Sequence, residues 1–511
     1  MVVTLSDMLR NAARRWPDEP AYAYVSRTLT WAEVDRRVDA LAAALQARGV
    51  KPGQVVGSLT RDGPVMVELV YAAARIGAVR AGLNYRMAAG EIGTILQHCA
   101  CSLVYVEDAY ASLVPALPGL KVLSAGDGQQ DLGQYADDLA HHAGRPVAEV
   151  RHEIAQYCYT TGSTGRPKAA VWTHQAIDYA IAHSLMDFGF RHDDVWLHTF
   201  PGAGTPIVLA IWNVLKGFKT VVMPGFEPAL ALDLMQQHGV TRVLLVPTML
   251  NALCEEQKVR PRQVDSVRCI TYGSAPTPPA LIRRAAATFS NAVFEQVYGA
   301  TEGCGGFFAK LSAEDHARAL SGSEKMLESC GMATPHAIVR VLRDDGTPCE
   351  VNEVGEISVQ GGFIMQGYLD EPELSANALR HNAYMTGDMG RMDEKGYIYL
   401  VDRKQFMIIT GGYNVYPIEV ENAVSAHPDI LEVCVFGVPD THWGEIVHAA
   451  IVQRPGSDLT QEQVLAWSRD RLAKFKIPKS IEFRDALLRG ATGKIQKRAE
   501  RDRYINQLAS A

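Results

Sequence analysis

Regular alternation of strand-type and helix-type patterns is the feature that most restricts the fold of this chain. The stretch TLTWAEVDRRVDALAAALQARGVKPGQVVGSL predicts a strand, a helix that ends at Gly49, a turn and a second strand. The same order recurs in MVELVYAAARIGAVRAGL and in ALDLMQQHGVTRVLLVPTMLNAL, where a helix ends at Gly239 and the run VLLV suits a strand covered on both faces. Parallel or mixed sheets with covering helices are therefore expected.

The length of the chain and a change in sequence pattern predict more than one domain. At 511 residues the chain exceeds the size at which one hydrophobic core stops growing. After about Gly331 short strands and turns replace the longer elements, and DDG supplies hairpin turn chemistry. The pattern thus predicts a β-rich unit appended to the α/β part, followed by a compact α+β domain that contains the helix EQVLAWSRDRLAKF.

Composition and charge exclude several classes of protein. A net charge of −7 argues against nucleic acid as a bulk electrostatic partner. The nine cysteines show no spacing typical of a zinc site or a disulfide framework, and the cluster HCAC reads as a buried helix end. No signal-type leader and no run of apolar residues long enough for a membrane span is present, so a cytoplasmic protein with reduced thiols is expected.

The densest group of hydroxyls, glycines and positive charge is YTTGSTGRPKAAVWTH, which follows the predicted strand IAQYCYT. Freed backbone N–H groups, hydroxyls and one lysine can together bind a polyphosphate. It is not a Walker A loop, because Pro167 precedes the lysine and Ala169 follows it. A polar surface turn is the alternative. The predicted phosphate-binding residues are Thr160, Thr161, Gly162, Ser163, Thr164, Gly165 and Lys168.

Five further stretches follow in order along the chain: YGSAPTPPA, VYGATEG, YMTGDMG, DRKQFMIITGGYNVYPIEVE and GATGKIQKR. With the phosphate loop they resemble the ordered motif set of the adenylate-forming superfamily, which comprises acyl-CoA synthetases, adenylation domains and beetle luciferases. The resemblance covers essentially the whole chain. It implies an α/β fold with an N-terminal AMP-binding domain over residues 1–404 and a small, mobile α+β C-terminal domain over 405–511.

The resemblance also implies a two-step reaction and a set of nucleotide-binding residues. A carboxylate and ATP give an acyl adenylate and pyrophosphate, and a thiol then takes the acyl group. Glu302 matches the magnesium ligand, Thr301 would contact the α-phosphate and Tyr298 would face the adenine. Asp388 would accept hydrogen bonds from the ribose, with Arg403 nearby. Further residues of the implied nucleotide site are Ser274, Ala275, Pro276, Gly299 and Ala300.

The C-terminal part of the resemblance carries the implied catalytic lysine, Lys494. In the family the matching lysine bridges the carboxylate and phosphate oxygens, where negative charge grows. Gln405 matches the residue about which the C-terminal domain rotates, although lysine or aspartate is more usual there. Gly411 and Gly412 match the pair beside which pantetheine passes, which favours a CoA ligase over a luciferase-like oxygenase.

The acyl pocket is less sharply defined by sequence. LHTFPGAG matches a segment that gates the pocket in many relatives, and it puts Pro201 where a histidine is common, followed by Gly202. Tyr272, which precedes Gly273, either lines the bottom of the acyl pocket or fills the hydrophobic core. Because no arginine or lysine falls at an obvious pocket position, a dicarboxylate is disfavoured. The expected substrate is a medium- or long-chain, alicyclic or aryl monocarboxylic acid.

The motifs together predict a ligase of fatty acid metabolism: an AMP-forming acyl-CoA synthetase that uses ATP, Mg²⁺ and CoA and binds no nucleic acid. A homodimer is one candidate assembly. One alternative in the same chemistry is a stand-alone adenylating enzyme that loads an acyl group onto a carrier protein. An alternative of another class is a catalytically silent nucleotide-binding protein. The combination of Lys494, Glu302 and Asp388 speaks against the silent protein, because a simple binder has no need of the bridging lysine.

Overall fold

The computed structural model describes residues 2–161, 167–275, 277–322, 324–490 and 495–510. The chain forms two compact units. Unit 1 comprises Met1–Val339, Val359–Tyr384 and Gly396–Ile398, and unit 2 comprises Arg340–Ser358, Met385–Lys395 and Tyr399–Ala511. The mixed α/β architecture of a large unit and a smaller unit confirms the predicted fold class, while the boundary at residues 404 and 405 stays a prediction.

Unit 1 contains a nine-stranded sheet in the order β15-β14-β13-β12-β11-β9-β10-β1-β2. From β1 to β13 neighbouring strands are parallel, and the two edges are antiparallel. Such strands need crossover connections, which the helices between them supply. The strands are β1 (Pro20–Ala23), β2 (Thr28–Thr30), β9 (Val195–His198), β10 (Lys219–Val222), β11 (Arg242–Leu245), β12 (Cys269–Gly273), β13 (Val293–Tyr298), β14 (Ala309–Leu311) and β15 (Met332–Ala333).

A second sheet of unit 1 has seven strands in the order β18-β8-β7-β4-β3-β5-β6. Its strands are β3 (Val55–Leu59), β4 (Val79–Gly82), β5 (Cys101–Val106), β6 (Lys121–Ser124), β7 (Ile154–Thr161), β8 (Pro167–Thr173) and β18 (Gly367–Tyr368). β7 and β8 pair antiparallel on either side of the predicted phosphate loop. A strand, and not a helix, therefore follows the loop, which agrees with the exclusion of a Walker A arrangement.

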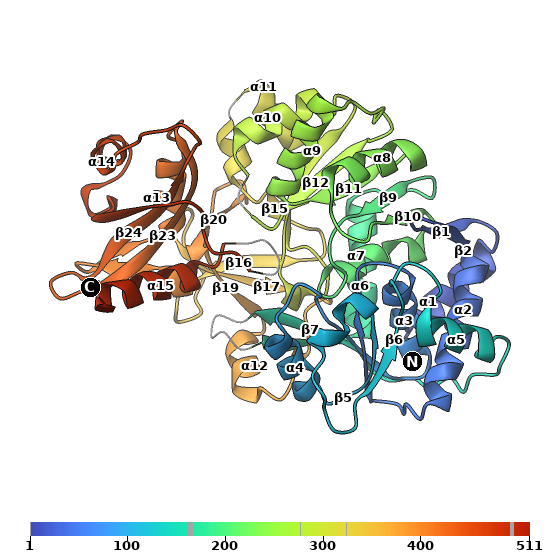
Figure 1. Ribbon diagram of the computed structural model, residues 1–511. Coiled ribbons are helices and arrows are strands. Elements are labelled where there is room, and N and C mark those ends of the chain that lie inside the picture. The colour runs from blue at the N-terminus through green and yellow to red at the C-terminus, as the bar shows by residue number, and fades with distance from the viewer. Residues whose placement is uncertain (1, 162–166, 276, 323, 491–494, 511) are drawn as a thin grey trace. The chain divides into compact units, whose positions relative to one another are not determined.

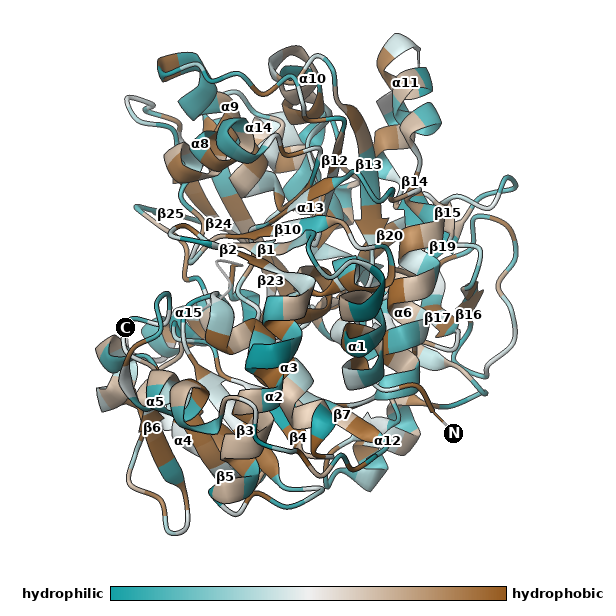
Figure 2. Cartoon of the chain, turned by 90° about the vertical axis from the view of Figure 1, so that its right-hand side faces the viewer, coloured by the Kyte–Doolittle hydropathy of each residue, from teal (hydrophilic) through white to brown (hydrophobic). Residues whose placement is uncertain are grey.

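Helices cover the two sheets of unit 1, and Figure 1 shows α8, α9 and α10 beside β11 and β12. The apolar faces of these helices share one core with the strands they cover, and α4 packs on the other sheet in a second core. Figure 2 shows mainly hydrophobic strands and helices of mixed character, as expected for covered sheets. The helices are α1 (Leu5–Arg15), α2 (Trp31–Ala47), α3 (Pro64–Arg75), α4 (Ala89–His98), α5 (Gly133–His142), α6 (His174–Asp187), α7 (Pro206–Ala210), α8 (Pro228–His238), α9 (Pro247–Val259), α10 (Pro279–Thr288), α11 (Ala313–Ser321) and α12 (Pro372–Ala378).

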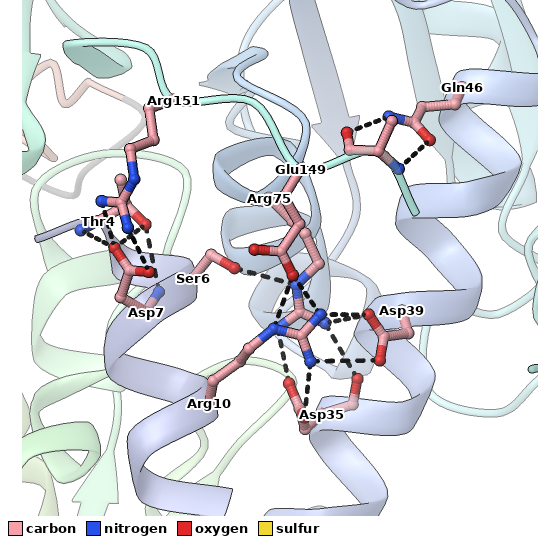
Figure 3. A network of polar contacts seen from close by, with 11 residues as sticks. Thr4, Ser6, Asp7, Arg10, Asp35, Asp39, Gln46, Arg75, Glu149 and Arg151 are labelled. Atoms are coloured by element: carbon pink, nitrogen blue, oxygen red, sulfur yellow. Dashed lines mark hydrogen bonds and ion pairs between the residues drawn. The ribbon is translucent and has the colours of Figure 1, made fainter. Parts of the chain in front are cut away.

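A buried arginine joins the first three helices (Figure 3). The guanidinium of Arg75 on α3 is fully buried and contacts Asp35 Oδ1 at 2.6 Å and Asp39 Oδ1 at 2.8 Å, both on α2. Its Nε donates to Ser6 Oγ of α1 at 3.0 Å. Arg10 of α1 contacts the same two carboxylates from the more exposed side. Opposite charges thus satisfy the buried guanidinium and fix the packing of α1, α2 and α3.

Unit 2 is built around a sheet in the order β22-β21-β24-β23, with β25 parallel to β24. A further sheet, β16-β17-β19-β20, has residues assigned to both units. The elements are β16 (Ile338–Leu342), β17 (Gly355–Gln360), β19 (Tyr384–Met392), β20 (Ile398–Arg403), β21 (Ile408–Thr410), β22 (Tyr413–Val415), β23 (Ile430–Asp440), β24 (Gly444–Gln453), β25 (Ser480–Arg484), α13 (Pro417–Ser425), α14 (Gln461–Arg469) and α15 (Lys497–Ser510).

Three sequence expectations can be checked directly. The predicted helix EQVLAWSRDRLAKF is too long: α14 ends at Arg469, where the backbone N–H groups of Arg471 and Leu472 both turn back to Ser468 O. All nine cysteines are free thiols, as expected. Among the described residues no helix is long and apolar enough to cross a membrane.

Candidate active site

The two ends of the predicted phosphate loop lie opposite each other on β7 and β8. Thr160 and Lys168 are paired positions of this antiparallel ladder. The Thr160 hydroxyl is buried and has no hydrogen-bond partner among the described residues. An unpaired buried hydroxyl at the exit of a strand can donate to a phosphate oxygen, which fits the prediction. Thr161 ends β7, and the other predicted loop residues, Gly162, Ser163, Thr164 and Gly165, lie outside the described residues.

Lys168 and Glu302, predicted separately for phosphate and for magnesium, meet at the hydroxyl of Tyr368. Lys168 Nζ donates to Tyr368 Oη at 2.6 Å, and Tyr368 Oη donates to Glu302 Oε1 at 2.5 Å. Lys168 Nζ is itself 3.3 Å from Glu302 Oε1 and 4.1 Å from the centre of the Tyr368 ring. The structure therefore brings the two predicted groups together through a tyrosine that the sequence analysis did not identify.

Backbone pairing explains why these three side chains converge. β18 pairs antiparallel with β8, which sets Tyr368 opposite Ala170, two residues after Lys168. The same segment reaches Glu302, because the Met365 N–H donates to the Glu302 carbonyl at 2.8 Å. No local signal could have revealed this cluster, since Tyr368 is 200 residues from Lys168 and 66 from Glu302.

The environment of Glu302 keeps its carboxylate charged. Burial raises the pKa of Glu302, but the charge of Lys168 and hydrogen bonds that include those from Tyr368 and Tyr384 outweigh burial, so the pKa lies below its ordinary value. No cluster of three or more His, Cys, Asp or Glu side chains suited to a metal occurs in the described part of the chain. One carboxylate without a protein cage fits Mg²⁺ shared with substrate phosphates, because this ion is usually bound by one or two carboxylates and phosphate oxygens.

The residues on either side of Glu302 are held by short contacts within unit 1. Thr205 Oγ1 donates to Thr301 Oγ1 at 2.9 Å, which joins the predicted α-phosphate residue to the segment that follows the predicted acyl gate. Tyr298 is buried at the end of β13, with its ring edge-on to Phe308. A Cβ at Gly299 would come within 3.1 Å of the Gly306 carbonyl oxygen, so little room exists for a side chain there. Ala300 precedes the short turn that carries Glu302.

The segment after β12 combines a tight approach with an unusual backbone. A Cβ at Gly273 would lie 2.5 Å from the Val297 carbonyl oxygen, so glycine is required for β12 to pack against β13. Ser274 has a φ of 69°, in the left-handed region. Tyr272 is fully buried in the core, and its hydroxyl contacts His316 Nε2 at 2.7 Å, which favours the core-filling role. Ala275 is exposed, and Pro276 lies outside the described residues.

A buried arginine and a buried aspartate hold the backbone of the predicted acyl gate by hydrogen bonds. Arg80 Nη2 donates to the Gly202 carbonyl at 2.9 Å, and the Gly202 N–H donates to Asp62 Oδ1 at 2.8 Å. Arg80 is 2% exposed and Asp62 3%, and burial lowers the pKa of Arg80 to about 10. Pro201 is half-buried beside this clamped peptide. Neither charged residue could be assigned to the gate from sequence, because their partner lies 122 and 140 positions away.

In unit 2 the predicted ribose aspartate is paired with the predicted arginine. Arg403 Nε lies 2.5 Å from Asp388 Oδ1, and the Asp388 side chain is 9% exposed. The Asp388 N–H donates to Thr386 Oγ1 at 3.0 Å, which fixes the part of β19 that carries the carboxylate. The predicted hinge residue, Gln405, lies in the short 3₁₀ turn Lys404–Phe406. Lys404 is anchored by two carboxylates of the same unit.

Gly411 and Gly412 form the turn between β21 and β22. Their φ values of 56° and 80° lie in the left-handed region, and a Cβ at Gly411 would meet the Trp443 ring at 2.8 Å. Lys479 Nζ lies 3.3 Å from the centre of the Trp443 ring. Trp443 is 43% exposed. An exposed indole and a cation therefore flank the predicted pantetheine passage. Lys494, the predicted catalytic lysine, lies outside the described residues.

Comparison with known proteins was consistent across sequence and structure. A sequence model described as AMP-binding enzyme matches residues 9–369, and one described as AMP-binding enzyme C-terminal domain matches residues 419–494. The feruloyl-CoA synthase of an Amycolatopsis species is 35% identical over 96% of this chain and 97% of its own length. The indoleacetate–CoA ligase of Aromatoleum aromaticum is 32% identical over 96% of each chain.

A solved structure gives the same correspondence in three dimensions. ATP-bound MatB from Rhodopseudomonas palustris superimposes with a TM-score of 0.88 at 26% identity. The match covers 99% of this chain and 100% of that one. Both the large unit and the small unit thus have counterparts in a protein that binds ATP.

Proposed function

Because the chain belongs to the AMP-binding enzyme family, we propose that it joins a monocarboxylic acid to CoA through an acyl-AMP intermediate. The chain is an AMP-forming acid–thiol ligase, since its curated relatives are acyl-CoA and aryl-CoA ligases with the same AMP-binding domain. The proposal adds the acceptor thiol, the class of acid and the residues that act.

One observation carries the proposal: Lys168 Nζ lies 3.3 Å from Glu302 Oε1 at the base of a glycine- and hydroxyl-rich loop. A cation for phosphate oxygens and a buried carboxylate for a hard metal ion are what a polyphosphate bound with Mg²⁺ requires at one place. Burial of a charged glutamate is costly and is not expected beside a solvated surface turn. This argues for the phosphate loop over the surface turn.

We assign roles to the residues of unit 1 as follows. Thr160 and Lys168 bind the terminal phosphates, and Thr301 donates to the α-phosphate. Glu302 holds Mg²⁺, which when bound neutralises phosphate charge so that a carboxylate can approach. Tyr298 supports the adenine. The remaining loop and turn residues of the predicted site supply backbone contacts.

In the proposed reaction, unit 2 contributes residues to both steps. Asp388 and Arg403, already paired with each other, bind the ribose. Gln405 is the hinge about which residues 405–511 rotate, and Lys494 bridges the carboxylate and the phosphate during adenylation. CoA is favoured as the acceptor because Trp443 and Lys479 offer a stacking surface and a cation beside Gly411.

The proposed acid is an aryl or medium- to long-chain monocarboxylate, and aryl acids are the favoured class. Two relatives named for aryl acids, feruloyl-CoA synthase and indoleacetate–CoA ligase, support the aryl class. A Cβ at Gly204 would have Pro206 Cδ, at 3.9 Å, as its nearest neighbour, which suits a bulky acyl group there, whereas Met66 fills the space beside Gly202. Arg80, the buried cation that contacts the gate, already donates to the Gly202 carbonyl, which supports a substrate with a single carboxylate.

The test measures pyrophosphate release and loss of free thiol together, with ATP, Mg²⁺, CoA and a panel of aryl, alicyclic and aliphatic acids. One acid that produces both signals is the expected result. If pyrophosphate is released without loss of thiol, carrier-protein loading becomes the proposed function. If no acid produces either signal, the proposal is refuted. Lys494→Ala should lose adenylation while retaining ATP binding, and Lys258→Ala, an exposed lysine, is the matched control.

A further inference from the structure

We propose that Tyr368 is a positioning residue of the adenylation site. Its hydroxyl orients the Glu302 carboxylate for a divalent metal ion. The same hydroxyl stays hydrogen-bonded to the carboxylate when Lys168 moves away, so the buried charge keeps a partner. This inference rests on the proposed function, because it takes Glu302 as the metal ligand and Lys168 as the phosphate-binding cation.

The direction of the hydrogen bonds follows from the chemistry of the three groups. An ammonium has only donors, a carboxylate only acceptors, and a phenol has one donor and can also accept. Lys168 Nζ, at 2.6 Å, must therefore donate to Tyr368 Oη. The single phenolic proton must then point to Glu302 Oε1, at 2.5 Å. Tyr368 thus fixes which carboxylate oxygen faces the protein and limits the rotation of Glu302.

Burial separates the two charged partners of Tyr368. The Glu302 side chain is 8% exposed, whereas the Lys168 side chain is 27% exposed. A long, partly exposed lysine can turn toward a phosphate oxygen at little cost, but the buried carboxylate cannot follow it. Without the hydrogen bonds from Tyr368 and Tyr384, the departure of Lys168 would leave a buried charge that is costly to keep ionised. The hydrogen bond from Tyr368 remains in place and stabilises the ionised form.

Tyr368 is itself rigidly placed. Its N–H donates to Ser375 Oγ at 2.8 Å, and its strand pairs with β8 on the side of the phosphate loop. The residue is 6% exposed. A side chain held by backbone pairing and burial can set the geometry of its neighbours in advance, so that no reorganisation is needed when the metal ion binds.

The experiment measures binding of Mn²⁺, as an electron paramagnetic resonance probe, in the presence of a saturating non-hydrolysable ATP analogue. Tyr368→Phe removes only the hydroxyl and keeps the ring over which Lys168 lies. Because hydrogen bonds to charged groups are among the stronger ones, the Mn²⁺ dissociation constant should rise roughly tenfold or more. In adenylation assays the apparent constant for Mg²⁺ should rise in parallel, while the KM for CoA stays unchanged.

The matched control is Tyr135→Phe, which removes a phenol of the same kind at another place. Tyr135 Oη donates to Glu68 Oε2 at 2.5 Å, and Arg37 Nε contacts Glu68 Oε1 at 2.6 Å, so a buried phenol, glutamate and cation again form one cluster. This variant should lose stability without a change in Mn²⁺ affinity. Equal effects of the two variants on Mn²⁺ affinity, or unchanged affinity in Tyr368→Phe, would overturn the inference.

A second variant keeps the inference testable if Tyr368→Phe does not fold. Lys168→Met leaves the bond between Tyr368 and Glu302, so it should weaken nucleotide binding but keep Mn²⁺ affinity at saturating nucleotide. Loss of Mn²⁺ affinity in Lys168→Met would assign the orientation of Glu302 to the lysine and refute the role of Tyr368. Failure of the wild-type enzyme to release pyrophosphate would instead refute the proposed function.

Discussion

Replacement of Arg80 by methionine should change the acid selectivity of the enzyme more than its stability. Arg80 donates to the Gly202 carbonyl at 2.9 Å and to Gln156 Oε1 at 3.2 Å, while Asp62 accepts from the Gly202 N–H at 2.8 Å. The predicted acyl gate is therefore held through one residue, Gly202, whose N–H and carbonyl each have a buried partner. Arg80→Met removes the partner of the carbonyl and retains the apolar stem.

The magnitude follows from the two opposing effects of the change. A buried carbonyl that loses its donor costs about 1–3 kcal/mol, which corresponds to about a 5- to 150-fold shift in the population of the clamped loop. Removal of a buried guanidinium also relieves its desolvation cost, which is several kcal/mol. Burial already lowers the pKa of Arg80 to about 10, which is the sign of that cost. We therefore expect a small net change in global stability and a larger change at the gate.

The assay compares kcat/KM for a panel of acids, the KM for ATP and the melting temperature in wild type and Arg80→Met. Broader or altered acid preference with an unchanged KM for ATP is the expected outcome. Gly82→Ala perturbs the same loop from another side, because its Cβ would lie 2.3 Å from the Ala203 carbonyl oxygen. If both variants keep the wild-type order of acids, the gate is not set by this clamp.

Three further outcomes are expected. Lys494→Ala should abolish most acyl-AMP formation, and unchanged pyrophosphate release would remove this lysine from the reaction. Arg75→Met should lower the free energy of unfolding, measured in urea, by about 3 kcal/mol, because it leaves Asp35 and Asp39 without their buried partner. Arg10→Met should lower the free energy of unfolding by less, and equal effects of the two variants would contradict this reasoning. Burial lowers the pKa of His174 to about 4 from 6.5. The unfolded chain then binds more protons between these values, so stability should fall by up to about 3 kcal/mol as pH drops from 6.5 to 4, and His174→Gln should flatten this dependence.

The alternation of strands and helices could be read from sequence because its causes are local. Gly49 and Gly239 follow helices at their predicted ends with φ values of 85° and 62°, a conformation in which glycine has no steric cost. The strand before the phosphate loop was likewise recognisable, and the exclusion of a Walker A loop on Pro167 agrees with the strand β8 that begins there. The helix predicted after Gln461 exists but was predicted too long, because the chain turns back at Ser468 and places Phe475 against Tyr413, a tertiary contact that overrides local propensity.

The sequence by itself therefore determined the fold class, the family and the order of the motifs, since these depend on periodicity and on residue types at short spacing. Only the tertiary structure decided which groups meet. The cluster of Lys168, Glu302 and Tyr368 exists because β18, 200 residues downstream of Lys168, pairs with β8. The clamp on Gly202 exists because Arg80, on β4 of the seven-stranded sheet, contacts the segment that follows β9 of the nine-stranded sheet. The local sequence pattern determines on which face of a helix or strand a side chain lies. Its partner depends on which distant segments of the chain become neighbours in the fold.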